Sequence, residues 1–275
     1  MNADVRLLLI SDPHLFASPE GKLRGVDTLS SLQQVLAHAA ADRRRTDAVL
    51  CNGDIVNEEP AGYAHFARVL GALGKPVYCV PGNHDDPARL RAALAQPPFQ
   101  VGGHVDLGAW RIILVDSCVP GSAGGRISAA ELDALRRALE GCERHVMVCV
   151  HHQPIGMASR WLDAVGIENA DEFFELLDAH PQVRAICWGH VHQSLDTRRR
   201  GVRLLATPST CVQFLPQSDK FALDRRPPAY RRLTLHADGS LDTEITWLDQ
   251  YGAEASDAGR AQADPPLRTA CGHRP

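Results

Sequence analysis

Five short apolar runs in the first two-thirds of the chain each end in a segment rich in Asp, Asn and His. The runs span residues 5–10, 48–51, 76–80, 146–150 and 183–188, and the segments that follow them are SDPH, NGD, PGNHD, HHQP and GHVH. Runs of this length predict buried strands. Because ligands of open α/β sheets bind outside the carboxyl ends of the strands, we expect these segments to converge on one crevice.

Amphipathic stretches separate the apolar runs and predict helices at 28–44, 62–73, 87–95, 128–139 and 169–179, with a further strand at 110–115. The last third differs, because 195–199 with 202–206, and 230–236 with 241–247, have the pattern of β-hairpins. We therefore expect a mixed α/β protein with more than one sheet and a β-rich C-terminal third. We expect one domain over residues 1–248, and a flexible tail over 249–275, which are small, polar and proline-containing.

Composition excludes several classes of protein. The chain has 275 residues, 44% of them hydrophobic, and a formal net charge of -4, which argues against nucleic acid or a membrane surface as partner. No apolar stretch reaches membrane length. The eight cysteines show no Cys-x-x-Cys spacing, and several lie in apolar runs. They predict buried thiols in a reducing cytoplasm. The arginine runs at 43–45, 198–200, 225–226 and 231–232 are expected on solvated faces.

The segments that end the five runs carry the residue types that bind metals. Each segment alone occurs by chance or as a turn, but five of them in one chain are not a structural accident. Carboxylate, amide oxygen and imidazole suit manganese, iron or zinc, and the set contains no thiolate. A carboxylate placed between two such ions can bridge them, and the ion pair can activate water and hold a phosphoryl group.

The order of these motifs resembles a known family. Asp-x-His at 12–14, Gly-Asp at 53–54, Gly-Asn-His-Asp at 82–85, His-x-x-Pro at 151–154 and Gly-His-x-His at 189–192 resemble the calcineurin-like metallophosphoesterase superfamily. The segments 115–121 and 125–127 are similar to the class III cyclic-nucleotide phosphodiesterases. Residues 159–163 and 204–214 are similar to the bacterial 3',5'-cyclic AMP phosphodiesterase type within that class. The resemblance covers about residues 5–248.

The resemblance implies a four-layer αββα sandwich, in which two mixed sheets are flanked by helices, and a centre of two metal ions. Iron, manganese or a mixed pair is the usual content of such a centre, and zinc fits the same ligands. Its implied residues are Asp12, His14 and His192 for the first metal, Asn83, His151 and His190 for the second, and Asp54 as the bridge. His84, as catalytic acid, and Asn83 would contact the substrate phosphate.

Four positions near these motifs need separate expectations. Many members of the superfamily carry an acidic residue three positions after the bridging aspartate, where this chain has Asn57, which supplies no charge to His84. His152 should point away from its neighbour His151 in an extended segment, and a substrate role is the alternative. The resemblance suggests that Thr210 and Cys211 line the nucleotide pocket, and a buried strand position for Cys211 is equally compatible.

The activity that the resemblance implies is hydrolysis of 3',5'-cyclic AMP to 5'-AMP by a hydroxide held between the two metals. The substrate partner is then a small cyclic nucleotide, and a homodimer is left open. Other phosphodiesters remain as alternatives, among them a 2',3'-cyclic nucleotide, a glycerophosphodiester and a nucleotide-lipid pyrophosphate. A non-catalytic scaffold on the same fold predicts lost ligands, and this chain has lost none.

Overall fold

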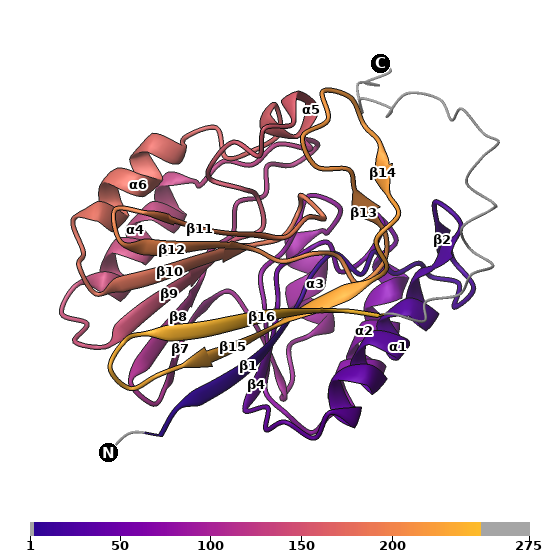
Figure 1. Cartoon of the computed structure of the whole chain (residues 1–275), viewed down its shortest axis with the longest axis horizontal. Coiled ribbons are helices and arrows are strands. Elements are labelled where there is room, and N and C mark those ends of the chain that lie inside the picture. Colours follow the sequence, from indigo (N-terminus) through magenta and orange to yellow (C-terminus); the bar gives the residue numbers. More distant parts are fainter. Residues whose placement is uncertain (1–2, 249–275) are drawn as a thin grey trace.

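Two stacked six-stranded sheets with helices on their outer faces form the protein (Figure 1). The structure is a computed structural model, and it describes residues 3–248. The strand order is β16-β15-β1-β4-β5-β6 in the first sheet and β11-β12-β10-β9-β8-β7 in the second. None of the helices in the described range is long and apolar enough to cross a membrane.

The first sheet holds three of the predicted site strands in parallel. These are β1 (Val5–Ile10), β4 (Ala48–Cys51) and β5 (Val77–Cys79), extended by parallel β6 (Phe99–Val101). On the other side of β1, the antiparallel strands β15 (Ala229–Leu235) and β16 (Leu241–Trp247) complete the sheet. Parallel neighbours need crossover connections, and the helices α1 (Thr28–Ala41), α2 (Tyr63–Gly71) and α3 (Pro87–Ala93) provide them.

The second sheet holds the other two site strands, β9 (His145–Cys149) and β10 (Val183–Trp188). They run parallel to each other, to β8 (Trp110–Leu114) and to β12 (Val202–Ala206). The antiparallel edge strands are β7 (Gly103–Leu107) and β11 (Leu195–Arg199). Helix α4 (Ala129–Leu139) connects β8 to β9, and α5 (Arg160–Asp163) and α6 (Ala170–Asp178) lie between β9 and β10. The remaining elements are short: β2 (Lys22–Leu23), β3 (Val26–Asp27), a 3-10 turn η1 (Pro60–Gly62), β13 (Gln213–Phe214) and β14 (Leu223–Asp224).

Three apolar cores show the layers directly. In β1, Leu8 and Ile10 pack in a core with residues of α1 and α2, while Leu7 and Leu9 pack in a core shared with the second sheet. This follows from the two-residue period of a strand, which sends alternate side chains to opposite faces. A third core joins the outer face of the second sheet to α4 and α6. The order of layers is therefore helices, sheet, sheet and helices, which confirms the predicted αββα sandwich.

The stacked parallel strands bring the predicted site segments together. The ends of β1, β4 and β5 are linked by backbone hydrogen bonds beyond the strands, such as Asp12 N to Gly53 O at 3.1 Å and Val80 N to Cys51 O at 3.1 Å. A bond from Gly189 N to His151 O, also 3.1 Å, links the ends of β9 and β10. The two sets of strand ends thus form one crevice across both sheets. The predicted tail lies outside the described residues, and the single-domain boundary stays a prediction.

One sequence expectation about charge is wrong in part. Arg231 is 1% exposed and Arg232 is 8% exposed, although their run was expected on a solvated face. The Arg231 guanidinium donates to Thr243 Oγ1 at 2.6 Å and to two backbone carbonyls, Leu195 O and Ala206 O, at 2.9 and 2.7 Å. The arginine therefore connects the first sheet to the second.

Candidate metal centre

The backbone turns sharply after three of the site strands, β1, β4 and β10. Five site residues without the freedom of glycine have positive φ angles: Asp12 (52°), His14 (47°), Asp54 (49°), His190 (63°) and His192 (46°). This left-handed region is uncommon for side chains other than Asn, Asp and His. Each such residue costs on the order of 1–3 kcal/mol and persists only where its surroundings fix it. Five of the eleven non-glycine residues with positive φ in the described range are thus residues that the sequence assigned to metal binding.

Glycines at the strand ends allow the segments to approach closely. A Cβ at Gly82 would lie 2.8 Å from Asp54 Cγ, and one at Gly53 would lie 2.8 Å from His151 Cγ. A Cβ at Gly189 would lie 2.9 Å from both Asn52 O and Asp12 Oδ2. These distances are below any ordinary carbon contact. The glycines of the Gly-Asp, Gly-Asn-His-Asp and Gly-His-x-His motifs are therefore needed for the side chains around them to meet.

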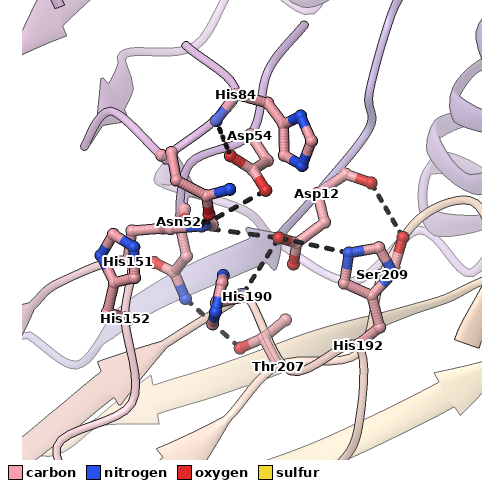
Figure 2. A network of polar contacts seen from close by, with 12 residues as sticks. Asp12, Asn52, Asp54, His84, His151, His152, His190, His192, Thr207 and Ser209 are labelled. Atoms are coloured by element: carbon pink, nitrogen blue, oxygen red, sulfur yellow. Dashed lines mark hydrogen bonds and ion pairs between the residues drawn. The ribbon is translucent and has the colours of Figure 1, made fainter. Parts of the chain in front are cut away.

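The first cluster consists of Asp12, His14, Asp54 and His192, all buried, with one ligand atom from each within 4.8 Å of the others. His14 Nε2 lies 3.2 Å from His192 Nε2 and 3.5 Å from Asp54 Oδ2. His192 Nε2 lies 3.6 Å from Asp12 Oδ1. Figure 2 shows Asp12, Asp54 and His192 of this cluster, with Asp12 at the centre of the view and Asp54 above it.

The second cluster consists of His151, His152 and His190, also buried and also within 4.8 Å by their ligand atoms. His151 Nε2 lies 3.1 Å from Asn83 Oδ1 and 3.3 Å from Asp54 Oδ2. The same oxygen of Asp54 therefore approaches histidines of both clusters. The structure brings together all seven residues that the sequence assigned to the metals, and it adds His152.

The expectation for His152 is wrong. Residues 151 and 152 lie in a bend, so the alternation of an extended segment does not apply. The ring of His152 faces the rings of His151 and His190, with centroids 4.9 and 4.7 Å away. The sequence could have signalled this, because the next residues include Pro154, which disfavours a continuing strand.

Backbone carbonyls fix the orientation of two of the histidines. His151 Nδ1 lies 2.6 Å from Asn52 O, and His192 Nδ1 lies 2.8 Å from Val212 O. A carbonyl oxygen only accepts, so each Nδ1 carries the proton and donates it. The Nε2 lone pairs then face the clusters. Such partners commonly orient and tune metal-binding histidines.

Burial and charge set the protonation states of the clusters. Burial lowers the pKa of His192 to about 3 and that of His14 and His190 well below the usual value, so these rings are neutral at pH 7. Burial raises the pKa of Asp54, but His151 and His84 oppose it more strongly and leave the pKa well below its usual range. Burial lowers the pKa of His151, but the charge of Asp54 outweighs it and raises that pKa to about 9. Asp54 is therefore an anion that lies between the neutral ring of His14 and the charged ring of His151.

Several buried polar atoms of the clusters have no hydrogen-bond partner among the described residues. They include Asp12 Oδ2 and His190 Nε2. An unsatisfied buried polar atom costs about 1–3 kcal/mol, so two together in one crevice indicate that another group satisfies them. Oxygen and imidazole nitrogen donors without thiolate fit manganese, iron or zinc. The Asp and His residues are positioned for a binuclear metal site.

His84 lies at the edge of the first cluster and is partly exposed. Its backbone N–H donates to Asp54 Oδ1 at 2.9 Å, and its ring meets that of His14 edge-on at 4.9 Å. Glu58 Oε1 lies 3.6 Å from His84 Nδ1. Asn57 supplies no charge there, as expected, but the adjacent Glu58 does. Sequence reasoning missed Glu58, which has a left-handed backbone at φ 62° that redirects its side chain.

Asp85 is a second residue that sequence reasoning left without a role. Its carboxylate accepts hydrogen bonds from Ile55 N, Val56 N, Gly82 N and Tyr63 Oη, at 2.9–3.1 Å. It therefore ties the loop after β4 to the loop after β5. Its place in the Gly-Asn-His-Asp motif was the available signal.

Thr210 and Cys211 lie behind the clusters. Both are buried, at 0% and 1% exposure. Thr210 N donates to Ser11 O at 2.9 Å, and the Cys211 thiol donates to Asp12 O at 3.3 Å. The neighbouring Ser209 hydroxyl, shown in Figure 2, also donates to Asp12 O, at 2.8 Å. Residues 209–211 thus hold the backbone that carries Asp12, and the nucleotide contacts of Thr210 and Cys211 stay a prediction.

Solved structures of metal-dependent phosphatases share this fold. A dimetal phosphatase from Danio rerio matches with a TM-score of 0.61 and 15% identity, covering 84% of this chain and 95% of that one. A purple acid phosphatase from yellow lupin matches with a TM-score of 0.57 and 13% identity, covering 94% of this chain and 52% of that one. At these identities the similarity establishes the fold alone.

Sequence comparison gives a nearer relationship. A protein of Pseudomonas aeruginosa named 3',5'-cyclic adenosine monophosphate phosphodiesterase CpdA is 41% identical over 250 residues, which are 90% of this chain and 92% of the relative. The protein of the same name from Escherichia coli K12 is 40% identical over 246 residues, 88% and 90% of the two chains. The model of the calcineurin-like phosphoesterase family matches residues 5–194. The chain therefore belongs to the calcineurin-like phosphoesterase family.

Proposed function

We propose that this chain hydrolyses 3',5'-cyclic AMP to 5'-AMP at a centre of two metal ions. The observation that carries the proposal is the pair of clusters that share Asp54, whose Oδ2 lies 3.5 Å from His14 Nε2 and 3.3 Å from His151 Nε2. The relatives named as 3',5'-cyclic AMP phosphodiesterases support the choice of substrate, because they are 37–41% identical over about 90% of the chain.

The assignment of ligands follows the two clusters. We assign Asp12, His14 and His192 to the first metal, Asn83, His151 and His190 to the second, and Asp54 to both. When bound, two such ions lower the pKa of a bound water and neutralise charge on a phosphoryl group. Iron, manganese or a mixed pair is our expectation for the metals, and zinc suits the same donors.

The chain's own residues then position the ester and move a proton. We assign Asn83 and His84 to the phosphate, because both are partly exposed at the edge of the clusters. As the oxygen of water bonds to phosphorus and the bond from phosphorus to the ribose 3' oxygen breaks, His84 gives a proton to that leaving oxygen. Such general acid catalysis contributes typically ~10²–10⁴ in rate. Glu58 Oε1 lies 3.6 Å from His84 Nδ1, on the exposed side of this ring.

We propose that Thr210 and Cys211 line the nucleotide pocket, and their burial gives them a second, supporting part. Both contact the backbone of Ser11 and Asp12, so they support the first metal position from behind. The seven cysteines of the described range are all free, which agrees with a reducing cytoplasm as the location we propose.

The test is hydrolysis by metal-reconstituted protein of 3',5'-cyclic AMP, 2',3'-cyclic AMP and bis(p-nitrophenyl) phosphate, with the products separated. We expect 5'-AMP from the first substrate at a kcat/KM well above that for the second. Turnover of 2',3'-cyclic AMP or of the nitrophenyl ester alone would retain the metal centre but replace the proposed substrate by another phosphodiester.

A further inference from the structure

His152 has the environment of a functional residue, although it is not among the residues assigned as metal ligands. Its side chain is buried, and its ring packs against both histidines assigned to the second metal, at 4.9 and 4.7 Å between centroids. Its Nε2 has no hydrogen-bond partner among residues 3–248. A buried ring nitrogen left in this way costs free energy unless a ligand satisfies it.

Two segments outside the metal clusters are shaped around this ring. Ser117, just beyond β8, places its Oγ 2.7 Å from His152 Nδ1. A Cβ at Gly125 would lie 2.5 Å from the same Nδ1 and 2.8 Å from His152 Cβ, so only glycine leaves room for the ring. The backbone at Gly125 is itself held, because its N–H donates to Gly166 O at 3.1 Å. His152 therefore has one fixed orientation.

The hydrogen bonds of Ser117 decide which nitrogen of His152 carries the proton. Ser117 is completely buried, and its Oγ accepts the backbone N–H of His152 at 3.4 Å. Among the hydrogen bonds of the described range, its hydroxyl hydrogen has one acceptor, His152 Nδ1, and the backbone of Ala123 also lies within hydrogen-bonding reach of the His152 ring. If Nδ1 carried the ring proton instead, the hydroxyl hydrogen would be buried without an acceptor. The satisfied arrangement leaves Nδ1 as acceptor and places the ring proton on Nε2.

A protonated Nε2 has no lone pair for a metal, but it is a hydrogen-bond donor. One ring nitrogen of His152 lies within 4.8 Å of the ligand atoms of His151 and His190. We propose that His152 binds substrate, with Nε2–H donating to a phosphoryl oxygen of the ester held at the second cluster, and that Ser117 and Gly125 position it. This inference rests on the proposed phosphodiesterase function but not on cyclic AMP as the substrate. The segments around 115–117 and 125–127 then position one hydrogen-bond donor, the Nε2–H group of His152.

The test compares His152→Phe with the wild-type holoenzyme on bis(p-nitrophenyl) phosphate. Phenylalanine keeps a ring against His151 and His190 but offers no donor, and adding Ser117→Ala avoids a stranded hydroxyl. We expect two metals per chain, a kcat/KM lower by roughly 10²-fold, as for loss of one donor to a transition-state oxyanion, and weaker inhibition by inorganic phosphate. His152→Gln, which restores an N–H donor, should recover part of the loss.

Two controls keep the outcomes distinct. His145→Phe changes a histidine at the opposite end of β9 and should leave activity and metal content at wild-type levels. A long-range ¹H–¹⁵N spectrum of the metal-free protein should show the proton of His152 on Nε2.

Loss of one metal from His152→Phe would make His152 a ligand, and full activity would leave it a packing role. Either result, or a proton on Nδ1, overturns the proposal. Wild-type protein that hydrolyses bis(p-nitrophenyl) phosphate but not cyclic AMP would overturn the proposed substrate alone. Hydrolysis of neither ester would overturn both.

Discussion

Gly82→Ala tests whether the position of Asp54 controls the centre. The new Cβ would lie 2.8 Å from Asp54 Cγ and nearer still to its Oδ1 and backbone nitrogen. Carbon atoms in contact are normally about 3.5–4.0 Å apart, so the carboxylate has to move by about 1 Å. Gly82 does not have a positive φ, so the effect is the collision and not a strained backbone. A displacement of this size can cost about 10² in rate, and overpacking typically costs 1–3 kcal/mol of stability.

The assay measures kcat/KM, metal content and the urea midpoint of Gly82→Ala after metal reconstitution. We expect a rate roughly 10²-fold lower and weaker metal retention. The matched control is Gly71→Ala at the end of α2, where a Cβ meets only the ring of Phe99 at 3.8 Å. It should leave activity unchanged and stabilise the helix by up to about 0.5–1 kcal/mol. Wild-type rate and metal content in Gly82→Ala would refute the claim that Asp54 has to sit where the structure has it.

Four further changes have definite expected outcomes. Asp54→Ala should remove both metals, measured by elemental analysis, and full occupancy would exclude the bridging assignment. His84→Ala should keep both metals and lose about 10²–10⁴ in kcat on esters with poor leaving groups, with little loss on nitrophenyl esters; loss of metal would show a different role. Arg231→Met should lower the free energy of unfolding by about 1–3 kcal/mol in urea titrations, because it strands buried carbonyl acceptors between the sheets, and an unchanged midpoint would contradict this. The pKa of His236 is raised, chiefly by a hydrogen bond to Asp242, so its contribution to stability is full below pH 6.5 and disappears as pH rises through the folded pKa; His236→Gln should flatten that fall, and an identical pH profile would count against it.

The fold was largely predictable because its signals are local and periodic. Buried parallel strands appear as continuous apolar runs, so β1, β4 and β10 match their predicted bounds. The edge strands β6 and β7 were not predicted. Their side chains are partly or fully exposed, so neither an apolar run nor a clear alternation marks them.

The candidate site was predictable as a set of motifs and less so as a geometry. Motif order identified the residues of the two clusters except His152, because strand ends in this fold meet at one edge. The orientation of His152 depends on a bend and on Ser117 and Gly125, which are 35 and 27 positions away in the chain. The approach of Glu58 to His84 depends on a positive φ. Long-range contacts and single backbone angles of this kind leave no periodic trace in a sequence.

The most direct test of the account is an anomalous-difference map from crystals of protein reconstituted with manganese, recorded at an energy where the metal scatters strongly. The account predicts two peaks, one among Asp12, His14 and His192 and the other among Asn83, His151 and His190, with an oxygen of Asp54 bound to both. A single peak, or two peaks of which Asp54 touches only one, would contradict the shared carboxylate on which the proposed chemistry depends.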